Sequence, residues 1–331
     1  MNDNCNFNSN TGTQMRALFT LAAAVTMLGT APSAASAQAA DRMNPIIAAQ
    51  EKGWPIFGIA HPRITAGGAR GGRGGAAPAA PVTPPPEINL ADAAKETVGY
   101  KRADYLYTSG TSEAFLRYME EITKAGGSMR THPFSAKIGI WHENPERVTT
   151  NIIRQLNAGH VSVSMEAVES AQEVRDVIKA MRFASAGGTR PDTGLAAAAA
   201  YWGLSIDQYK KKADIWPLNK NGELFISVII ESKEGVAKAR EIAAEPGVGQ
   251  IFAGWGTLGG VYRDDPAGRA AAAATILAAC KEYKVPCGFP TNTPAEMEQR
   301  LAEGWMVHIL QRRDSNAFAA VETGRAKFGR K

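Results

Sequence analysis

Short apolar segments alternate with longer amphipathic segments along most of this chain. Apolar runs of about four to eight residues that end in polar or glycine residues are typical of buried strands. They predict eight strands, at residues 54–59, 105–108, 137–141, 161–165, 224–231, 250–253, 285–288 and 305–310. Segments with helical spacing predict the helices between them, at residues 112–124, 145–157, 170–181, 233–244, 267–282 and 294–303.

The number and order of these segments indicate a single architecture. Eight strands, most of which lead into a helix, match a (β/α)8 TIM barrel of α/β class. The predicted strands are apolar rather than alternating, as expected where both faces of a strand are buried. Several helices begin with a capping residue or an early proline, as in Asn292-Thr293-Pro294. We therefore expect one TIM-barrel domain over residues 41–331.

The N-terminal region has the features of a targeting segment. Arg16 supplies a positive charge, residues 17–28 are apolar, and Ala35-Ser36-Ala37 resembles a cleavage site. Residues 1–14 are polar and fit a signal peptide poorly, so Met15 is an alternative start. The apolar run is too short to stay as a membrane span. We expect residues 1–40 to be a signal peptide and extension that is removed, and the protein to be exported to the periplasm.

Two segments interrupt the alternation. Residues 66–86 are rich in Gly, Ala, Arg and Pro, a composition that cannot build a core, so we predict a surface loop. This insert follows the first strand on the face where active-site loops gather, but a neutral insertion is the simpler interpretation. Residues 184–216 form a long connection for which we expect short helices of its own. Such connections wall a site or build an oligomer contact.

Charge and cysteine content narrow the function class. The formal net charge is +5, and the arginines are spread out rather than interleaved with aromatic residues, so nucleic-acid binding is not indicated. Cys280 and Cys287 would need a tight fold-back to form a bridge, which favours buried thiols over a disulfide. Neither cysteine has a neighbouring histidine that would suggest a nucleophile.

Two strand ends carry the most informative residues. Ile230-Glu231-Ser232-Lys233-Glu234-Gly235 ends one predicted strand, and Gly254-Trp255-Gly256-Thr257 ends the next. In a TIM barrel the carboxyl ends of the strands form the active site. An acid on one strand and a glycine-rich turn on the next are suited to hold a divalent cation and a small oxyanion. The alternative is a capping acid followed by a tight turn.

Several of these segments resemble one known family. Residues 156–171 are similar to its fourth strand and helix, residues 188–202 to its Gly-x-Arg-Gly segment and Ala-rich helix, and residues 230–235 to its metal-binding Ile-Glu-Thr/Ser-x-Glu-Gly motif. Residues 252–254 resemble its Phe-Ile-Gly motif. On these motifs the chain resembles the metal-dependent class II pyruvate aldolases of the 4-hydroxy-2-oxoheptanedioate aldolase/citrate lyase β-subunit (HpcH/HpaI) family.

The resemblance implies a barrel of the phosphoenolpyruvate/pyruvate type, a divalent metal bound by Glu231, and a homo-oligomer built through the last helix. It also implies that Arg190 and the turn from Gly254 to Thr257 bind substrate. The chain departs from the family pattern at three places. Thr257 stands where the family has its second metal-binding aspartate, residues 107–113 lack the family's histidine, and residues 138–143 lack its pyruvyl-binding arginine.

Other polar residues at strand ends can rebuild such a site. Glu166 adds a second acid one strand away from Glu231, and His61 and His142 follow the first and third strands. Two carboxylates with one histidine would suit Mn, Zn or Fe better than Mg. His142 and His61 are the candidates for proton transfer, although both could merely cap loops. Separately, His160 at a strand start and His308 within an apolar strand are expected to be structural.

The leading hypothesis is therefore a carbon–carbon lyase that cleaves a 2-oxo acid or a related carbonyl compound with a divalent metal. One alternative is a barrel enzyme of different chemistry, because one scaffold carries many reactions. Another is an exported, non-catalytic protein that binds a small molecule. In each case the expected partner is a small molecule, with no nucleic acid and no membrane span after removal of the signal. The apolar positions of residues 313–328 would pack against a neighbouring subunit or cover the chain's own barrel.

Overall fold

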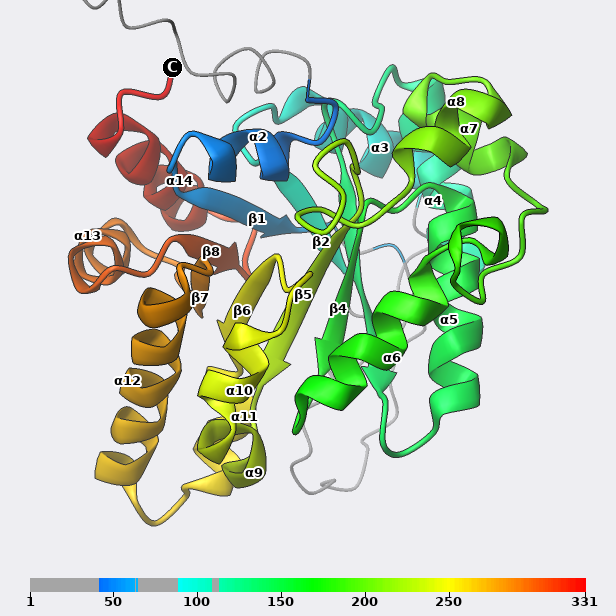
Figure 1. Ribbon diagram of the computed structural model, residues 1–331. Coiled ribbons are helices and arrows are strands. Elements are labelled where there is room, and N and C mark those ends of the chain that lie inside the picture. The colour runs from blue at the N-terminus through cyan, green and yellow to red at the C-terminus, as the bar shows by residue number, and fades with distance from the viewer. Residues whose placement is uncertain (1–41, 63, 65–88, 109–112) are drawn as a thin grey trace, which may run out of the picture.

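Eight parallel strands close into a barrel in the order of the sequence (Figure 1). The computed structural model describes residues 42–62, 64, 89–108 and 113–331. The last strand pairs with the first, for example through Gly58 and Ile309, which closes the barrel. The predicted TIM barrel is thus confirmed. The strands are β1 (Ile56–Ala60), β2 (Tyr105–Thr108), β3 (Phe134–Ile140), β4 (Ser162–Glu166), β5 (Phe225–Ile230), β6 (Gln250–Ala253), β7 (Cys287–Pro290) and β8 (Val307–Leu310).

The helices surround this barrel, and most begin with a side chain that caps their first turn, such as Asn144 before α5 and Thr293 before α13. All six predicted helices are present, although residues 233–244 form two helices rather than one. The helices are α2 (Pro45–Glu51), α3 (Leu90–Gly99), α4 (Glu113–Lys124), α5 (Pro145–Ala158), α6 (Ala171–Met181), α7 (Ala196–Trp202), α8 (Ile206–Lys212), α9 (Lys233–Ala237), α10 (Ala239–Ala244), α11 (Trp255–Val261), α12 (Pro266–Tyr283), α13 (Pro294–Glu303) and α14 (Ser315–Lys327), with the short 3-10 helix η1 (Ala184–Ala186).

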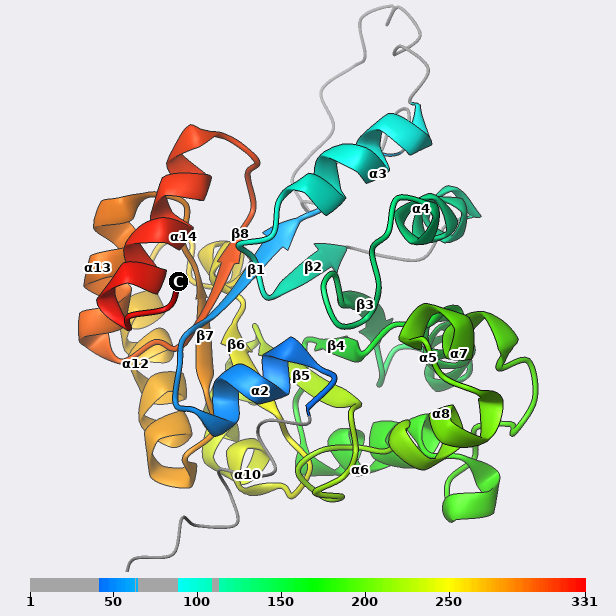
Figure 2. The same cartoon turned by 90° about the horizontal axis from the view of Figure 1, so that it is seen from above.

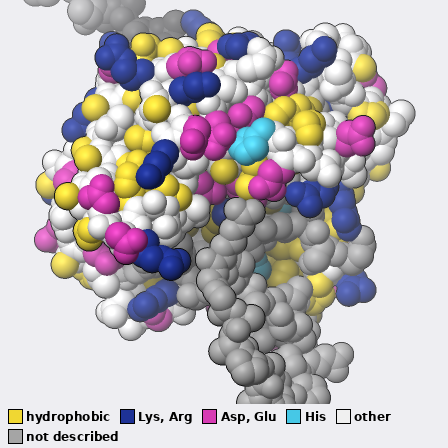
Figure 3. Space-filling model, turned by 90° about the horizontal axis from the view of Figure 1, so that it is seen from below, with side chains coloured by type: hydrophobic (Ala, Val, Ile, Leu, Met, Phe, Trp, Pro, Cys, Tyr) yellow, Lys and Arg dark blue, Asp and Glu magenta, His cyan; other side chains and the backbone are white. Residues whose placement is uncertain are grey.

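The two ends of the barrel differ. At the end where the strands begin, α2 lies across the opening (Figure 2), and Gln50 on α2 donates a hydrogen bond to the carbonyl of Gly249 before β6. At the other end the strands lead into the loops before their helices. This second end is the barrel mouth, and it presents acidic, basic and apolar side chains side by side (Figure 3).

The interior of the barrel contains a polar layer. Tyr105 on β2 interacts with Gln250 on β6, across the barrel, so both point inward. Gln250 also donates to Ser227 on β5 at 2.9 Å. Along β4, serines alternate with apolar residues at positions 162–165, and all are buried. The prediction of uniformly apolar strands is therefore wrong for the inner face, because successive side chains on a strand point to opposite sides.

Strand β3 has an irregularity just before its end. Its register with β4 shifts between Lys137 and Gly139, and Gly139 has φ 97°, in the region that favours glycine. A bulge of this kind changes the direction in which the following side chains point. Lys137 precedes the shift and keeps the inward direction of Ser135 two residues earlier. The residues after the shift lead into α5 instead.

The connection over residues 184–216 packs against the end of α5. Trp202 donates to the carbonyl of Gly159 at 2.9 Å, and Tyr209 donates to the carbonyl of Leu156 at 3.0 Å. These carbonyls lie where α5 ends and β4 is about to begin, on the end opposite the mouth. The short helices expected here are present, but they do not wall the barrel mouth.

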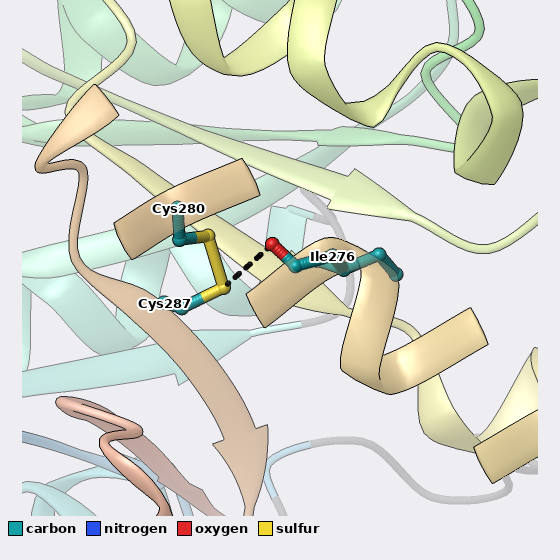
Figure 4. The surroundings of a disulfide bond; sticks show 3 residues. All are labelled: Ile276, Cys280 and Cys287. Atoms are coloured by element: carbon teal, nitrogen blue, oxygen red, sulfur yellow. Dashed lines mark hydrogen bonds between the residues drawn. A yellow bond between two sulfur atoms is a disulfide. The ribbon is translucent and has the colours of Figure 1, made fainter. Parts of the chain in front are cut away.

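A disulfide joins Cys280 and Cys287, contrary to the expectation of free thiols (Figure 4). Helix α12 ends at Tyr283, and Lys284 adopts a left-handed conformation with φ 57° that reverses the chain. This fold-back brings the two Cα atoms within 5.7 Å, inside the range that a disulfide spans. The tight turn required for a bridge is thus built into the end of the helix.

The last helix, α14, covers the chain's own barrel beside α13. Ala317, Ala320 and Val321 are fully buried, and the ring of Phe318 lies 4.5 Å from that of Tyr100. The structure therefore favours the second of the two roles considered for residues 313–328. Assembly into a homo-oligomer stays a prediction.

Two expectations fall outside the part of the chain that the structure describes. These are the signal peptide at residues 1–40 and the Gly/Pro-rich insert at residues 66–86. Within the described ranges, no helix has the length and apolar character needed to cross a membrane.

The C-terminus is tied to the start of the barrel by a buried ion pair, which gives the first prediction. Arg330 and Asp104 pair at 2.5 Å with side chains only 7% and 6% exposed, and Asp104 also accepts from the Phe57 amide at 2.9 Å. Asp104→Ala leaves the arginine buried without its acid, so we expect a loss of about 3 kcal/mol in unfolding free energy, measured by urea denaturation. Asp92→Ala is the control, because Asp92 is exposed on α3 and should change stability by less than about 1 kcal/mol. Equal effects of the two substitutions would contradict the role of the buried pair.

Candidate functional site

A cavity of about 110 Å³ opens at the barrel mouth. The described residues that line it come from strand ends on several sides of the barrel and from the first turn of α11. They are Tyr107, Lys137, Ile229, Glu231, Phe252, Gly254, Trp255, Gly256, Thr257, Pro290, Ile309 and Gln311. Its volume is small beside the roughly 300–1,000 Å³ of pockets for drug-sized ligands. The cavity is therefore suited to a compact ligand.

Glu231, the acid that the sequence singled out, faces this cavity from the end of β5. It is only 9% exposed, and its carboxylate interacts with the Thr257 hydroxyl and the Ala167 amide. Burial raises the pKa of Glu231. The Thr257 hydroxyl and the positive charge of Lys137 both lower this pKa, but they offset the effect of burial only in part. Such a carboxyl group is suited to take up and return a proton.

The residue after β4 is held in an unusual conformation beside this acid. Ala167 has φ 47°, a left-handed conformation that costs about 1–2 kcal/mol for a residue other than glycine. It directs the Ala167 amide at the Glu231 carboxylate. Backbone strain of this kind is concentrated at functional sites, where the surrounding structure maintains it.

Lys137 is the cation of the cavity. Its Nζ atom lies 2.8 Å from Oε1 of Glu166, and both side chains are about one quarter exposed, at 23% and 24%. Burial alone would lower the pKa of Lys137, but its interactions with Tyr107, Glu166 and Glu231 outweigh burial and raise the pKa to about 12. The side chain is thus a permanent ammonium group. Burial also raises the pKa of Tyr107, which interacts with Lys137.

Gly254 lets the turn after β6 approach Glu231 closely. A Cβ atom at this position would lie 2.4 Å from Cβ and 2.6 Å from Oε2 of Glu231, so any side chain would displace the acid. The next residue, Trp255, is held in place by the guanidinium of Arg269, 3.6 Å from its ring centre, and by Phe289. The glycine-rich turn predicted from the sequence therefore lies against the predicted acid.

The predicted site residues fall into two groups. The structure brings together Glu231, Glu166 and the turn from Gly254 to Thr257, with Glu166 joined to the cavity through Lys137. The histidines are not among the described lining residues. The ring of His142 lies 3.5 Å from Glu173 at the start of α6, and that of His61 packs against Phe115 of α4.

The surroundings of three histidines, His61, His160 and His308, bear on the roles predicted for them. Burial lowers the pKa of His61, whose Nδ1 lies 2.5 Å from the carbonyl of Pro62. His160 and His308 are fully buried, and burial lowers their pKa to about 4 and about 3, as expected for neutral structural histidines.

Arg190 lies far from the role that the resemblance implied. It is fully buried, donates to Asn157 and Tyr209 at 2.9 Å, and lies 4.5 Å from the ring centre of Phe183. Asn157 lies near the end of α5, and Tyr209 lies on α8 in the connection that packs there. Arg190 therefore anchors that connection and is not part of the cavity.

Sequence reasoning missed Lys137 and Tyr107. The search for a cation covered residues 138–143, one position too late, because the strand actually starts at Phe134. A signal was available in the alternation: Ser135 and Lys137 lie on one face of the strand, as do Tyr105 and Tyr107 on β2. A lysine inside a predicted buried strand is itself unusual, because lysines are rarely buried without a partner.

Comparison with known proteins places this geometry in context. Residues 138–287 match the sequence profile of the HpcH/HpaI aldolase/citrate lyase family. The hydroxypyruvate/pyruvate aldolase of Paraburkholderia phytofirmans is 29% identical over 158 residues, which cover 46% of this chain. That match spans 58% of the relative's length.

Solved structures share the fold. An HpcH/HpaI aldolase/citrate lyase family protein from Burkholderia cenocepacia has a TM-score of 0.58 at 19% identity, covering 83% of this chain and 94% of its own. The HpcH/HpaI aldolase from Desulfitobacterium hafniense has a TM-score of 0.57 at 16% identity, covering 85% and 93%. Macrophomate synthase has a TM-score of 0.56 at 15% identity, covering 89% and 87%.

The close approach at Gly254 gives the second prediction. Gly254→Ala should lower the unfolding free energy by about 1–3 kcal/mol, because the new methyl group overlaps Glu231. Gly256→Ala is the matched control on the same turn, since a Cβ there meets nothing within 4 Å. It should be neutral or stabilise by up to about 1 kcal/mol. Thermal and urea unfolding of both variants measures the difference, and a Gly254→Ala protein as stable as Gly256→Ala would refute the contact.

Proposed function

We propose that this chain, which carries an HpcH/HpaI aldolase/citrate lyase family domain over residues 138–287, is a carbon–carbon lyase acting on a 2-oxo acid or a related carbonyl compound. The family and the aldolase relative support an aldolase- or lyase-type function that cleaves carbon–carbon bonds. The observation that carries the proposal is Glu231, the family's acid, which faces a cavity at the barrel mouth beside a cation.

The cavity suits a small oxo acid in size and in charge. Its volume of about 110 Å³ accommodates a compact ligand. Its lining divides into polar side chains, including Lys137, Tyr107, Thr257 and Gln311, and apolar ones, including Phe252, Pro290 and Ile309. A short carbon chain with oxygens at one end matches this division.

The chemistry of a retro-aldol step fits Glu231. Its carboxylate takes the proton of the substrate's 4-hydroxyl group, and the bond between C3 and C4 breaks to release an aldehyde. The electron pair of that bond moves between C2 and C3, so the oxo oxygen becomes an enolate. Glu231 then returns the proton to C3, which yields a 2-oxo acid. Its raised pKa suits a group that must perform both transfers.

A divalent metal was the expected cofactor, and the family generally depends on one. The residues present do not fit it. Thr257 replaces the second carboxylate and instead donates to Glu231, while the ammonium of Lys137 holds Glu166. Within the described ranges, no three His, Cys, Asp or Glu side chains gather into a possible metal site. A hard divalent cation requires several oxygen ligands, preferably carboxylates, so we derive no step through a metal.

A second candidate function is the binding of a small oxo acid without catalysis. The observation in its favour is that neither His61 nor His142 is among the described residues that line the cavity. Turnover separates the two candidates, because a binding protein would be stabilised by pyruvate or oxalate and yet release no product.

We further propose that the protein is exported to the periplasm and forms a homo-oligomer. The Cys280–Cys287 disulfide supports an oxidising compartment, and the apolar N-terminal run supports export.

Assembly into a homo-oligomer is supported by an apolar groove of about 600 Å³ between α4, α5 and α7, which is lined in part by Leu116, Met119 and Tyr201. Cell fractionation and light scattering are the corresponding measurements.

The role of Glu231 gives the third prediction. Purified protein should release pyruvate from at least one 4-hydroxy-2-oxo acid, and Glu231→Gln should lower kcat by about 10²-fold or more, because the amide cannot accept the proton. Glu234→Gln is the matched control, because it makes the same change three residues after Glu231, at an exposed position in the first turn of α9. It should leave kcat within about twofold. A wild-type protein that cleaves none of the substrates, with or without metals, would remove the lyase proposal.

The fourth prediction concerns pH. The Thr257 hydroxyl lowers the pKa of Glu231, so Thr257→Val should raise that pKa further. Activity that requires the carboxylate is lost as pH falls through this pKa, and the acidic limb of the kcat profile should therefore move to higher pH, by up to about one unit for one hydrogen bond. Thr257→Ser keeps the hydroxyl and should keep the wild-type limb. A limb that moves to lower pH, or that stays fixed in Thr257→Val, would contradict the assignment to Glu231.

A further inference from the structure

We propose that the ammonium group of Lys137 takes the place of the divalent cation in this site and binds the oxo and carboxylate oxygens of the substrate without a metal. The inference rests on the proposed function, because it names what neutralises the anionic substrate of that reaction. It concerns a residue of this chain whose position the sequence motifs did not indicate.

The position of Lys137 carries the argument. The side chain rises from β3 into the cavity that Glu231 enters from β5, and Glu166 of β4, the strand between them, binds its Nζ atom at 2.8 Å. Charge interactions link Lys137 to both acids. The ammonium thus lies against Glu166 and interacts electrostatically with Glu231, the two acids that the sequence predicted as metal ligands.

This arrangement opposes the binding of a divalent cation. A second positive ion between Glu166 and Glu231 would lie close to a permanent ammonium, and like charges repel strongly in a partly buried site. The cation would also have to compete for Glu166, which already accepts a charge-assisted hydrogen bond. In place of the family's second metal-binding carboxylate, Thr257 provides only a neutral hydroxyl. The lysine therefore already neutralises the charge of one of the two carboxylates, Glu166.

The same ammonium can stabilise an enolate. A lysine carries three N–H donors. Glu166 accepts from this group at 2.8 Å, which fixes its direction and leaves N–H donors for a ligand in the cavity. A preorganised positive charge next to the oxygen on which charge develops lowers the barrier of the step. The raised pKa keeps the group charged at neutral pH, so it acts as a fixed charge rather than as an amine nucleophile.

Oxalate is a suitable probe, because it resembles the enolate of pyruvate in shape and charge. The test is calorimetric titration of the full chain with oxalate, after treatment with a chelator and again with added Mn²⁺. We expect the same affinity in both conditions, at least tenfold weaker binding in Lys137→Met, and partial recovery in Lys137→Arg, which keeps the charge. Lys95→Met is the matched control, because Lys95 is an exposed residue on α3, and it should bind like the wild type.

A second measurement requires no substrate. Mn²⁺ binding, followed by electron paramagnetic resonance, should be weak in the wild type and at least tenfold tighter in Lys137→Met, because removal of the ammonium frees Glu166 and Glu231. Thermal unfolding of each variant establishes that it is folded.

The outcomes distinguish the inference from the proposed function. Oxalate binding that requires Mn²⁺, or Mn²⁺ binding that is tight in the wild type and not strengthened in Lys137→Met, overturns the inference and leaves the lyase proposal standing. Pyruvate release without any metal, abolished in Lys137→Met, supports both. Failure of the wild type to bind oxalate or pyruvate in either condition overturns both.

Discussion

The ion pair between Lys137 and Glu166 is the interaction on which the site depends. Inside a closed barrel, inward-pointing charges cannot reach bulk water freely and must be neutralised by one another. Lys137 pairs with Glu166 and its charge also acts on Glu231, so it offsets the repulsion between the two acids. The positive charge beside these acids is part of the protein, and the proposal of a site that works without a metal rests on it.

The barrel geometry explains why these residues meet at all. Every second residue of a strand points inward, so the tyrosine, serine and glutamine residues of the inner polar layer are followed two positions later by the residues of the mouth. Tyr105 leads to Tyr107, Ser135 to Lys137, and Gln250 leads through Phe252 to Gly254. The site is thus the last layer of the barrel interior. Its acid is placed by the strained backbone of Ala167 and by the missing side chain at Gly254, two local costs that the surrounding packing offsets.

The accuracy of the sequence predictions follows the physical origin of each signal. Strand β6 and helix α13 match their predicted bounds, because a short apolar run and a capped helix are both encoded by neighbouring residues. Strand β3 was predicted three residues late, since Ser135 interrupts its apolar character. The disulfide was missed for a related reason. Its feasibility depends on the left-handed Lys284, a conformation that the residue type does not reveal.

The sequence by itself determined the barrel, the acid at Glu231 and the glycine turn beside it, because periodicity, capping and short motifs are local properties. The tertiary structure alone decided which distant side chains share the cavity. It directed Lys137 inward and turned the chain after Gly139 toward α5. It also placed His142 beside Glu173, and it placed Arg190 at the opposite end of the barrel. These outcomes depend on strand register and on the direction of each side chain around the closed barrel. Neither is fixed until all eight strands have paired.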